Sequence, residues 1–506
     1  MIKDEHRKWW ILIAMGTVGG LFLLDETVVG VALPSIRHDL GMSQTLSHWV
    51  ISAYFLVFTA FAAVSGKMGD RIGFRNVVLI GCSAFGVGSL ACGFAEQGAV
   101  LIAARAVQGF GAAVLFPATI AMVTIVFPKE QRGMAIGVFA AITTSFLSVG
   151  PVLGGVLTEF VSWQWIFWIN VPLVVAIIVI VMLAWVDLPR ESEQPRLDYG
   201  GLITLVASLG MIIFGVMQGA SWGWTQPAIV GLLVGGVIAL VLFVIIENKT
   251  AEPLIEVDLF RSVSFSASTL VLFTGQYCKL SIVVFGALYL QDALGMSPLM
   301  AGLAILVPVA GFPFLSGPCG KIADKHGARK PVLVGLTVAT AAMVWIGLTA
   351  SRDSYWWLLP GFIGWGLGMP FCYVPVLRLV ANSVPKEKQG QTSGIAATAR
   401  LLGGTFGVSI SSTLLVGTDR FDAVFLVTAG IMFVTLVIGA LGIEHQSPGK
   451  EGAARENCEK GLGGEEKGAD LGDLGGESGW ERAWDGGLAG NLARMGVIEI
   501  LNIKLI

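Results

Sequence analysis

Charged side chains are scarce in this sequence. Only 13% of its 506 residues are Asp, Glu, Lys or Arg, whereas 55% are hydrophobic. A soluble domain usually carries about 25% charged residues, so this deficit argues against a soluble globular protein. Repeated apolar runs of about 20 residues predict spanning helices, because the strands of a membrane barrel are shorter and alternate in polarity. We therefore expect an all-α polytopic membrane protein.

Histidine and cysteine are too few and too scattered to suggest a metal centre. The six cysteines have no metal-ligand spacing, so we expect reduced, packed thiols. All five histidines fall in predicted loops or tails, which disfavours a zinc site or histidine-based catalysis within the membrane. No basic patch suggests nucleic acid. The sequence also lacks a nucleophile motif and a phosphate-binding loop, so a membrane enzyme or lipid-handling protein is the least favoured class.

Apolar windows predict about fourteen spans. Their approximate ranges are 10–33, 47–66, 77–95, 99–126, 133–158, 165–186, 200–219, 228–246, 265–290, 299–320, 332–350, 356–380, 392–416 and 422–443. One alternate set of connections holds eighteen Lys and Arg residues, whereas the other holds Arg37, Arg352 and Arg420. Because positive residues stay inside, this bias predicts an even number of spans and cytoplasmic termini in a plasma-membrane protein.

An internal repeat divides the chain. GKMGDRIGFRN at 66–76 resembles GKIADKHGARK at 320–330, and each follows the second predicted helix of its half. Two six-helix units would account for twelve spans and leave two between them. The predicted domains are a six-helix bundle at 1–190, two inserted helices with linkers at 191–260, a second six-helix bundle at 261–443, and a disordered Gly- and Glu-rich cytoplasmic tail at 444–506. A regulatory role for the tail and no role at all both stay open.

Two adjacent acids, Asp25 and Glu26, lie within the first predicted span. Asp25 is eight or nine residues from Pro34, which is roughly 12 Å by helical rise. A carboxylate kept in a bilayer usually faces a partner or a water-filled cavity, because burying its charge costs at least a few kcal/mol. The pair therefore predicts a proton- or cation-binding site. The alternative is a signal-anchor helix whose acids sit near an interface.

Arg105 is the predicted partner of these acids. It lies about seven residues inside its helix, at nearly the same depth as Asp25 and Glu26. A buried arginine must be paired, so we expect Arg105 to approach one of the two acids. Successive helix residues point about 100° apart, so one acid would face the central cavity and the other a neighbouring helix. We assign Asp25 as proton carrier and Glu26 to cationic substrate or a second proton; a static ion pair is the alternative.

Lys279 lies near the middle of the ninth predicted span. A lysine at that depth should be paired or face water. It would favour anionic or zwitterionic cargo, or it would pair with Asp25 or Glu26 across the cavity and be displaced by protons. The third possibility is a lysine that snorkels along a helix groove.

Glycine and proline mark candidate gating segments. Gly150, Pro151, Gly154 and Gly155 break and thin the fifth span, which predicts a hinge or seal, or plain close packing. The first of the two repeated loops predicts a tight turn whose charges can pair at a helix end, or basic residues that set topology alone. The loop residues assigned to gating are Gly66, Asp70, Arg71, Gly73 and Arg75 in the first copy and Asp324 and Arg329 in the second.

Five motifs together resemble one known family. These are LDETVVGVALP at 24–34, the loop at 66–75, LIAARAVQG at 101–109, GPVLGG at 150–155 and WQWIFWINVP at 163–172. In this order they resemble the fourteen-span drug:proton antiporter branch of the major facilitator superfamily, over about residues 10–443. Gln164 stands where that branch usually has arginine, and Arg400 matches an arginine common in its thirteenth span, for which packing against a carbonyl is the alternative. The resemblance implies the major facilitator fold, a functional Asp25 and Arg105, and gating by the glycine segments.

Residues and resemblance together predict a proton-coupled exporter of small amphipathic solutes that works by alternating access. The alternative is a proton-coupled, sodium-coupled or passive transporter of an anionic or zwitterionic metabolite. We expect a monomer in the lipid bilayer with a small-molecule substrate, no nucleic acid partner, no metal, and no cofactor beyond the proton gradient. The predicted cavity residues are Asp25, Glu26, Tyr54, Phe58, Phe146, Gln276, Tyr277, Lys279 and Tyr289.

Overall fold

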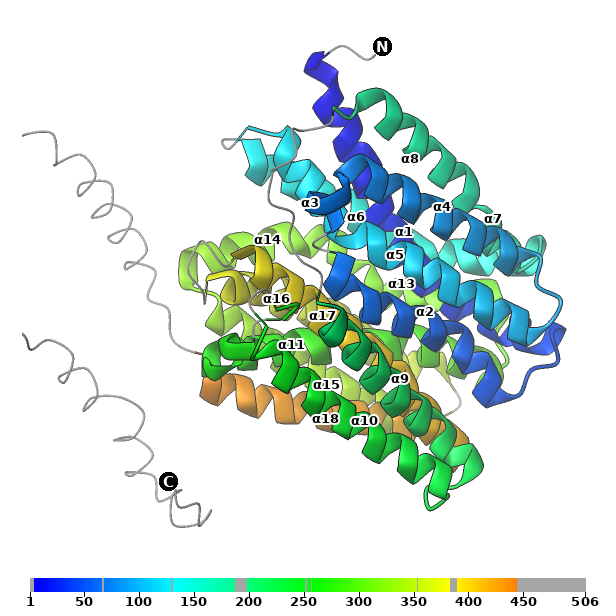
Figure 1. Cartoon of the computed structure of the whole chain (residues 1–506). Coiled ribbons are helices and arrows are strands. Elements are labelled where there is room, and N and C mark those ends of the chain that lie inside the picture. Colours follow the sequence, from blue (N-terminus) through cyan, green and yellow to red (C-terminus); the bar gives the residue numbers. More distant parts are fainter. Residues whose placement is uncertain are drawn as a thin grey trace, which may run out of the picture. The chain divides into compact units, whose positions relative to one another are not determined.

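The computed structural model describes most of the chain up to residue 443 (Figure 1). The described ranges are 4–65, 68–128, 131–186, 198–250, 253–255, 257–352, 354–382 and 389–443. Gly66 and the predicted tail at 444–506 lie outside them, as do the side chains of Asp70 and Asp324. Within these ranges, fourteen helical segments are long and apolar enough to cross a membrane, which is the number predicted from the sequence.

The N-terminal half, as we call α1 to α8, is a bundle of long helices. Its elements are α1 (Asp4–Asp39), α2 (Gln44–Ser65), α3 (Met68–Ile72), α4 (Phe74–Gly93), α5 (Gly98–Val126), α6 (Arg132–Phe160), α7 (Trp165–Trp168) and α8 (Asn170–Ala184). Helix α1 packs on α6, and α5 packs on both α2 and α4. Phe22 of α1 meets Phe58 of α2 and Phe116 of α5 in the buried core. Apolar packing thus fixes α1 and α5, which carry the embedded acids and Arg105.

The C-terminal half, as we call η2 to α18, has less regular helices. Its elements are η2 (Val257–Arg261), α11 (Val263–Leu280), η3 (Ser281–Phe285), α12 (Gly286–Leu288), η4 (Tyr289–Ala293), α13 (Pro298–Val309), α14 (Gly311–His326), α15 (Arg329–Thr349), α16 (Tyr355–Asn382), α17 (Gln389–Thr418) and α18 (Phe421–Gly442). The ninth predicted span contains two π-helical stretches, η3 and η4. The tenth divides at Ala310, two residues after Pro308, because proline removes one backbone donor from the helix.

The two inserted helices, α9 (Tyr199–Trp222) and α10 (Pro227–Glu247), pack against each other. Helix α9 also contacts α2 of the N-terminal half and α17 of the C-terminal half. On one side the rings of Trp49 and Phe214 are 5.5 Å apart, and on the other Thr413 Oγ1 donates to the Val216 carbonyl at 2.7 Å. The inserted pair therefore touches both halves where α2 meets α17.

The repeated loops turn the chain in the same way. Gly73 has φ +86° and ψ 142°, and Gly327, its counterpart in the second copy, has φ +79° and ψ 154°. Each stands at the turn into a long helix, α4 or α15. Because a positive φ favours glycine, the repeated sequence has the same backbone consequence in both halves. The predicted domain boundaries themselves stay predictions.

The GPVLGG segment lets α6 lie close to two helices. On the α1 side, a methyl group added to Gly150 would collide with Thr27, and one on Gly154 would lie 3.0 Å from the Val28 carbonyl oxygen. On the α13 side, one on Gly155 would lie 2.7 Å from Leu299 Cα. The structure therefore provides the close packing predicted for this segment, and it does so between the two halves as well as within one.

Enlarging Gly155 should destabilise the protein because its neighbour is the backbone of α13. We expect Gly155→Leu to cost about 1–3 kcal/mol of stability, as overpacking of a filled interior does. Gly137→Leu is the matched control, since Gly137 lies on the same helix with open space around it. The apparent melting temperature of the purified protein in detergent measures both. Equal melting of Gly155→Leu and wild type would contradict the close approach of α6 and α13.

Candidate functional site

Asp25 of α1 and Arg105 of α5 form a buried ion pair. Arg105 Nη1 is 2.8 Å from Asp25 Oδ1, and both side chains are 1% exposed. Arg105 Nη1 also donates to Gln108 Oε1 at 2.6 Å, and its Nε donates to the Val50 carbonyl at 2.9 Å. The ring of Tyr54 lies 4.4 Å from the guanidinium carbon. Arg105 is thereby held by α1, α2 and its own helix.

A chain of neutral polar groups continues from this pair. Gln108 Nε2 donates to Asp25 Oδ1 at 3.0 Å and to Ser89 Oγ at 3.0 Å, and Asn170 Nδ2 donates to Ser89 Oγ at 3.5 Å. Asp25 Oδ1 therefore accepts from both Arg105 and Gln108. Asp25 Oδ2 is buried and has no hydrogen-bond partner within the described residues. One oxygen of this carboxylate is thus fixed, and the other is available for a proton.

Glu26, the next residue, pairs with the opposite half of the protein. Its Oε2 is 2.5 Å from Lys279 Nζ, and its Oε1 accepts from Gln276 Nε2 at 3.1 Å. The exposed fractions are 7% for the Lys279 side chain and 5% for that of Glu26. Both partners lie on α11, so this contact joins the N-terminal half to the C-terminal half at the level of the embedded acids.

The backbone around Lys279 is irregular. The π-helical stretch η3 begins at Ser281, two residues after the lysine. Helix α1 lies very close to η3, since a methyl group on Gly30 would lie 3.3 Å from Val284 Cα. Single π-helical turns inside α-helices occur frequently at functional sites. The irregular stretch and the close approach of α1 thus lie directly after the part of α11 that contacts Glu26.

The side chains of Asp25 and Glu26 therefore point in different directions, as the 100° rotation between successive helix residues predicts. The expected approach of Arg105 to one of them is present and involves Asp25. Of the alternatives for Lys279, the structure has the one in which it pairs with Glu26 across the halves. The roles assigned to these residues stay predictions.

Three of the other predicted cavity residues lie near these pairs. Tyr54 packs on Arg105, and its hydroxyl is a buried group without a hydrogen-bond partner within the described ranges. Gln276 holds Glu26, and Phe58 packs on the Tyr54 ring with centroids 5.7 Å apart.

The remaining three are engaged elsewhere. Phe146 of α6 lies against Gly20 of α1, and Tyr277 lies where α11 packs closely on Gly407 of α17. Tyr289 donates its hydroxyl proton to the Ala350 carbonyl at 2.5 Å, and its ring packs between Phe421 and Phe425. Those contacts place Tyr289 in the packing of the C-terminal half, which does not favour its assignment to the cavity.

His48 corrects the expectation that every histidine lies in a loop or tail. It lies in the second turn of α2, completely buried, with Nδ1 2.5 Å from Ser412 Oγ of α17. Its ring also lies 5.3 Å from that of Phe285. His6 and His38 of α1 and His326, the last residue of α14, also lie in helices, and His6 and His38 are exposed. The signal that could have located His48 is the predicted span 47–66 itself, which already contains this histidine.

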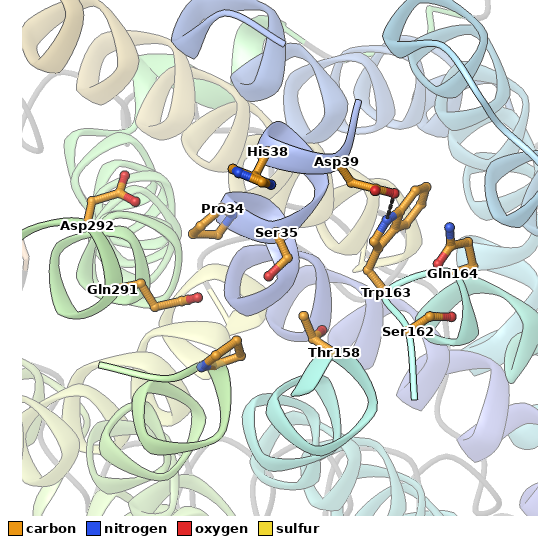
Figure 2. A pocket seen from close by; sticks show the side chains of 11 residues that line it. Pro34, Ser35, His38, Asp39, Thr158, Ser162, Trp163, Gln164, Gln291 and Asp292 are labelled. Atoms are coloured by element: carbon orange, nitrogen blue, oxygen red, sulfur yellow. Dashed lines mark hydrogen bonds between the residues drawn. The ribbon is translucent and has the colours of Figure 1, made fainter. Parts of the chain in front are cut away.

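A polar pocket of about 610 Å³ opens where α1, α6, η4 and α13 meet (Figure 2). Its lining residues are Pro34, Ser35, His38, Asp39, Thr158, Ser162, Trp163, Gln164, Gln291, Asp292 and Pro298. Figure 2 shows Asp39 hydrogen-bonded to Trp163, with Nε1 to Oδ2 at 2.8 Å. We call this the Arg37 end of the bundle, and the opposite end, where Lys8 bonds to Gln131, the Lys8 end.

Several contacts join the two halves at the Arg37 end. Arg37 makes a two-point ion pair with Asp292, with N–O distances of 3.1 Å. Gln291 Nε2 donates to the Val31 carbonyl at 2.8 Å, and Leu299 N donates to Glu159 Oε2 at 2.9 Å. Together with the close approach of α6 to α13, these contacts hold α1 and α6 against η4 and α13 at this end.

The predicted gating loops are described only in part. Arg71 and Arg75 are half-buried at α3 and the start of α4, and Gly73 forms the turn between these helices. Arg329 Nη2 donates to the Ala440 carbonyl at 2.8 Å, near the end of α18. A basic residue of the second copy thus pairs with a carbonyl at a helix end, which is the kind of contact predicted for the first loop. A gating role for these residues stays a prediction.

Arg400 of α17 lies over the ring of Tyr373, 4.8 Å from its centroid. It is also close enough to Lys279 for an electrostatic interaction. The C-terminal side of the site is therefore rich in positive charge. Among the described residues, no group of three or more His, Cys, Asp or Glu side chains is placed to hold a metal ion.

Among the described residues, twelve apolar spans in two halves and two inserted spans, with ion pairs buried within and between the halves, define a multi-pass membrane protein of the transporter type. The sequence matches the profile of the Major Facilitator Superfamily over residues 15–199, 198–408 and 265–484, and the chain belongs to this superfamily.

Proteins similar to the chain are named for drug resistance and export. The puromycin resistance protein pur8 of Streptomyces alboniger is 32% identical over 82% of this chain and 83% of its own length. The multidrug resistance protein Stp of Mycobacterium tuberculosis is 31% identical over 80% of this chain and 75% of its own length. The tetracenomycin C resistance and export protein of Streptomyces glaucescens is 29% identical over 81% and 76%. The predicted resemblance to the drug-exporting branch is confirmed.

A solved structure shows the same fold. The xylose transporter XylE of E. coli, in a partially occluded inward open conformation, aligns with 87% of this chain and 99% of its own chain. The TM-score is 0.63 at 12% sequence identity. This similarity concerns the fold alone, and it confirms the predicted major facilitator fold.

Removing the arginine of the buried pair should destabilise the protein. Arg105→Met leaves Asp25 as an uncompensated buried charge, which typically costs about 3–5 kcal/mol. Arg105→Met combined with Asp25→Asn should regain much of that loss. Arg261→Met is the control, because the Arg261–Asp258 ion pair is exposed and worth at most about 1 kcal/mol. Melting in detergent compares the variants, and equal melting of Arg105→Met and Arg261→Met would contradict the predicted cost.

Proposed function

We propose that this protein is a proton-coupled exporter of small amphipathic solutes. The observation that carries the proposal is the divergence of two adjacent embedded acids, one paired within the N-terminal half and the other paired to the C-terminal half. In this proposal, protons moving inward drive the solute outward by alternating access of the two halves. The names of the relatives, which mention puromycin and tetracenomycin C, support compounds of this kind as cargo.

The hydrogen bonds made by the carboxylate oxygens of the two acids support different roles for Asp25 and Glu26. Asp25 Oδ2 can take a proton while Oδ1 keeps its bonds to Arg105 and Gln108, so we assign Asp25 as the proton carrier. Both oxygens of Glu26 already have donors, so a proton there must displace an interaction. We therefore assign Glu26 as the group at which a proton and a positive group of the solute compete.

The contacts at the Arg37 end support an alternating-access cycle that includes a conformation closed at this end. Under the positive-inside pattern this end faces outward, and both termini are cytoplasmic in the plasma membrane. The Arg37–Asp292 pair would then belong to an outer gate that opens when the solute leaves. We further propose a monomer that works in the lipid bilayer without enzymatic activity, metal or cofactor, powered by the proton gradient.

A second candidate is a transporter of an anionic or zwitterionic metabolite that is passive or coupled to protons or sodium. The position of Lys279 and Arg400 beside Glu26 favours it, because these cations would attract a carboxylate. The two candidates differ in their response to an uncoupler, which abolishes proton-driven export and leaves passive flux intact.

Asp25→Asn should abolish proton-driven efflux while the protein still reaches the membrane. An amide cannot carry the proton, so transport into inverted vesicles energised by an acidic interior should fall to the level seen with an uncoupler. Puromycin and tetracenomycin C are the first solutes to assay. Asp258→Asn is the control, since this acid is exposed outside the spans. Full proton-driven efflux by Asp25→Asn would remove Asp25 from the mechanism, and flux that is insensitive to the uncoupler would favour the passive alternative.

Breaking the Arg37–Asp292 pair should loosen the outer end. A half-exposed ion pair contributes at most about 1 kcal/mol, so Arg37→Ala should speed modification of a cysteine placed at Ser35 by up to about fivefold. A membrane-impermeant maleimide reports the rate on intact cells. Arg420→Ala is the matched control, because the Arg420–Asp422 pair lies within one half. Unchanged labelling in Arg37→Ala would count against this pair as part of a gate.

A further inference from the structure

The Glu26–Lys279 pair is unusual because it buries two opposite charges between halves that must move apart. Both side chains are at least nine-tenths buried, and Gln276 occupies the second oxygen of Glu26. Removing one member of a buried pair leaves the other uncompensated, which is strongly unfavourable. Whatever enters this site must therefore compensate both charges.

The charge of the entering solute decides whether that condition is met. A cation alone would neutralise Glu26 and leave Lys279 without a counter-charge. An anion alone would neutralise Lys279 and leave Glu26 uncompensated unless it takes up a proton. A solute that carries both an ammonium and a carboxylate can replace both members of the pair, so no buried charge loses its partner.

Polar atoms around the pair offer further contacts to such a solute. Gln276 Oε1, Tyr373 Oη and Arg400 Nε are buried and have no hydrogen-bond partner among the described residues. Gln276 itself is 2% exposed and lies beside Glu26. An acceptor next to Glu26 suits an ammonium, and the Arg400 guanidinium near Lys279 suits a carboxylate.

We propose that the Glu26–Lys279 pair is the binding site of a zwitterionic solute, whose ammonium takes the place of Lys279 at Glu26 and whose carboxylate takes the place of Glu26 at Lys279. This inference rests on the proposed export function and specifies its substrate class. Solute entry exchanges one ion pair for two without changing the net charge of the site. A proton on Glu26 removes the acceptor of the ammonium and so drives release, which is the competition that antiport requires.

A charge series on one scaffold tests the substrate class. Ampicillin is zwitterionic, its methyl ester is cationic, and benzylpenicillin is the anion that lacks the amino group. A second series consists of 4-(aminomethyl)benzoic acid, its methyl ester and 4-methylbenzoic acid. We expect the zwitterion of at least one series to bind the purified full-length protein about 10-fold more tightly than its cationic and anionic counterparts. Each of these counterparts would leave one buried charge of the pair without a counter-charge.

Variants of the pair should change this preference in opposite directions. With Lys279→Met the cationic ester should become the tightest ligand of its series, and with Glu26→Gln the anion should. Lys249→Met, a change at an exposed lysine, should leave the preference intact. The double variant Glu26→Gln with Lys279→Met leaves neither position of the pair with an uncompensated charge, so it controls for unfolding of the single variants, and it should lose the preference for the zwitterion.

Binding is measured by calorimetry in detergent without a pH gradient, so a failure of proton coupling does not alter the result. Tighter binding of either ester or anion to the wild type, equal binding within each series, or binding of no compound overturns the zwitterion proposal. So does a zwitterion preference that survives in the double variant. Proton-driven efflux that is lost in Asp25→Asn would still stand in each of these cases, which separates this inference from the proposed function.

Discussion

The cost of keeping an ionised carboxylate away from water is the constraint on which this structure depends. Asp25 and Glu26 are neighbours on α1, so they point in different directions and need separate partners. Asp25 finds Arg105 on α5 of its own half, and Glu26 finds Lys279 on α11 of the other half. The requirement for two counter-charges thus ties α1, a helix of the N-terminal half, to both halves.

Close backbone packing makes this double attachment possible. Gly30 lets α1 approach the π-helical stretch η3, while Gly150 and Gly154 let α6 approach α1 from another side. Lipid supplies no hydrophobic force between helices, so such small residues are what allow tight van der Waals contact. The pair between the halves needs that proximity, because Lys279 can keep its short contact with Glu26 only while α1 and α11 lie close together.

The sequence alone predicted the number of spans, the repeated glycine turn and the approach of Arg105 to one of the two acids, because each follows from a strong local rule. It gave the pairing of Lys279 with Asp25 or Glu26 only as one of three alternatives. Hydropathy marks spans, a motif with Gly73 and Gly327 marks turns, and a buried charge demands a counter-charge. It could not predict that Tyr289 bonds to Ala350, that His48 is buried against Ser412, or that α11 continues as a π-helix. These depend on the register of helices far apart in the chain, which apolar composition does not encode.

The difference between the two acids also determines how protonation acts on the fold. Neutralising Asp25 alters a pair that lies wholly within the N-terminal half, so it changes the stability of that half without directly changing its attachment to the other. Neutralising Glu26 removes the attraction between α1 and α11 and therefore acts on the contact between the halves. The proposed proton-coupled exporter needs both effects, since it would have to hold a proton and also link protonation to the movement of the two halves. Because the two carboxylates are consecutive residues of one helix, protonation of either acts at the same turn of α1, and the proposed coupling would need no longer path.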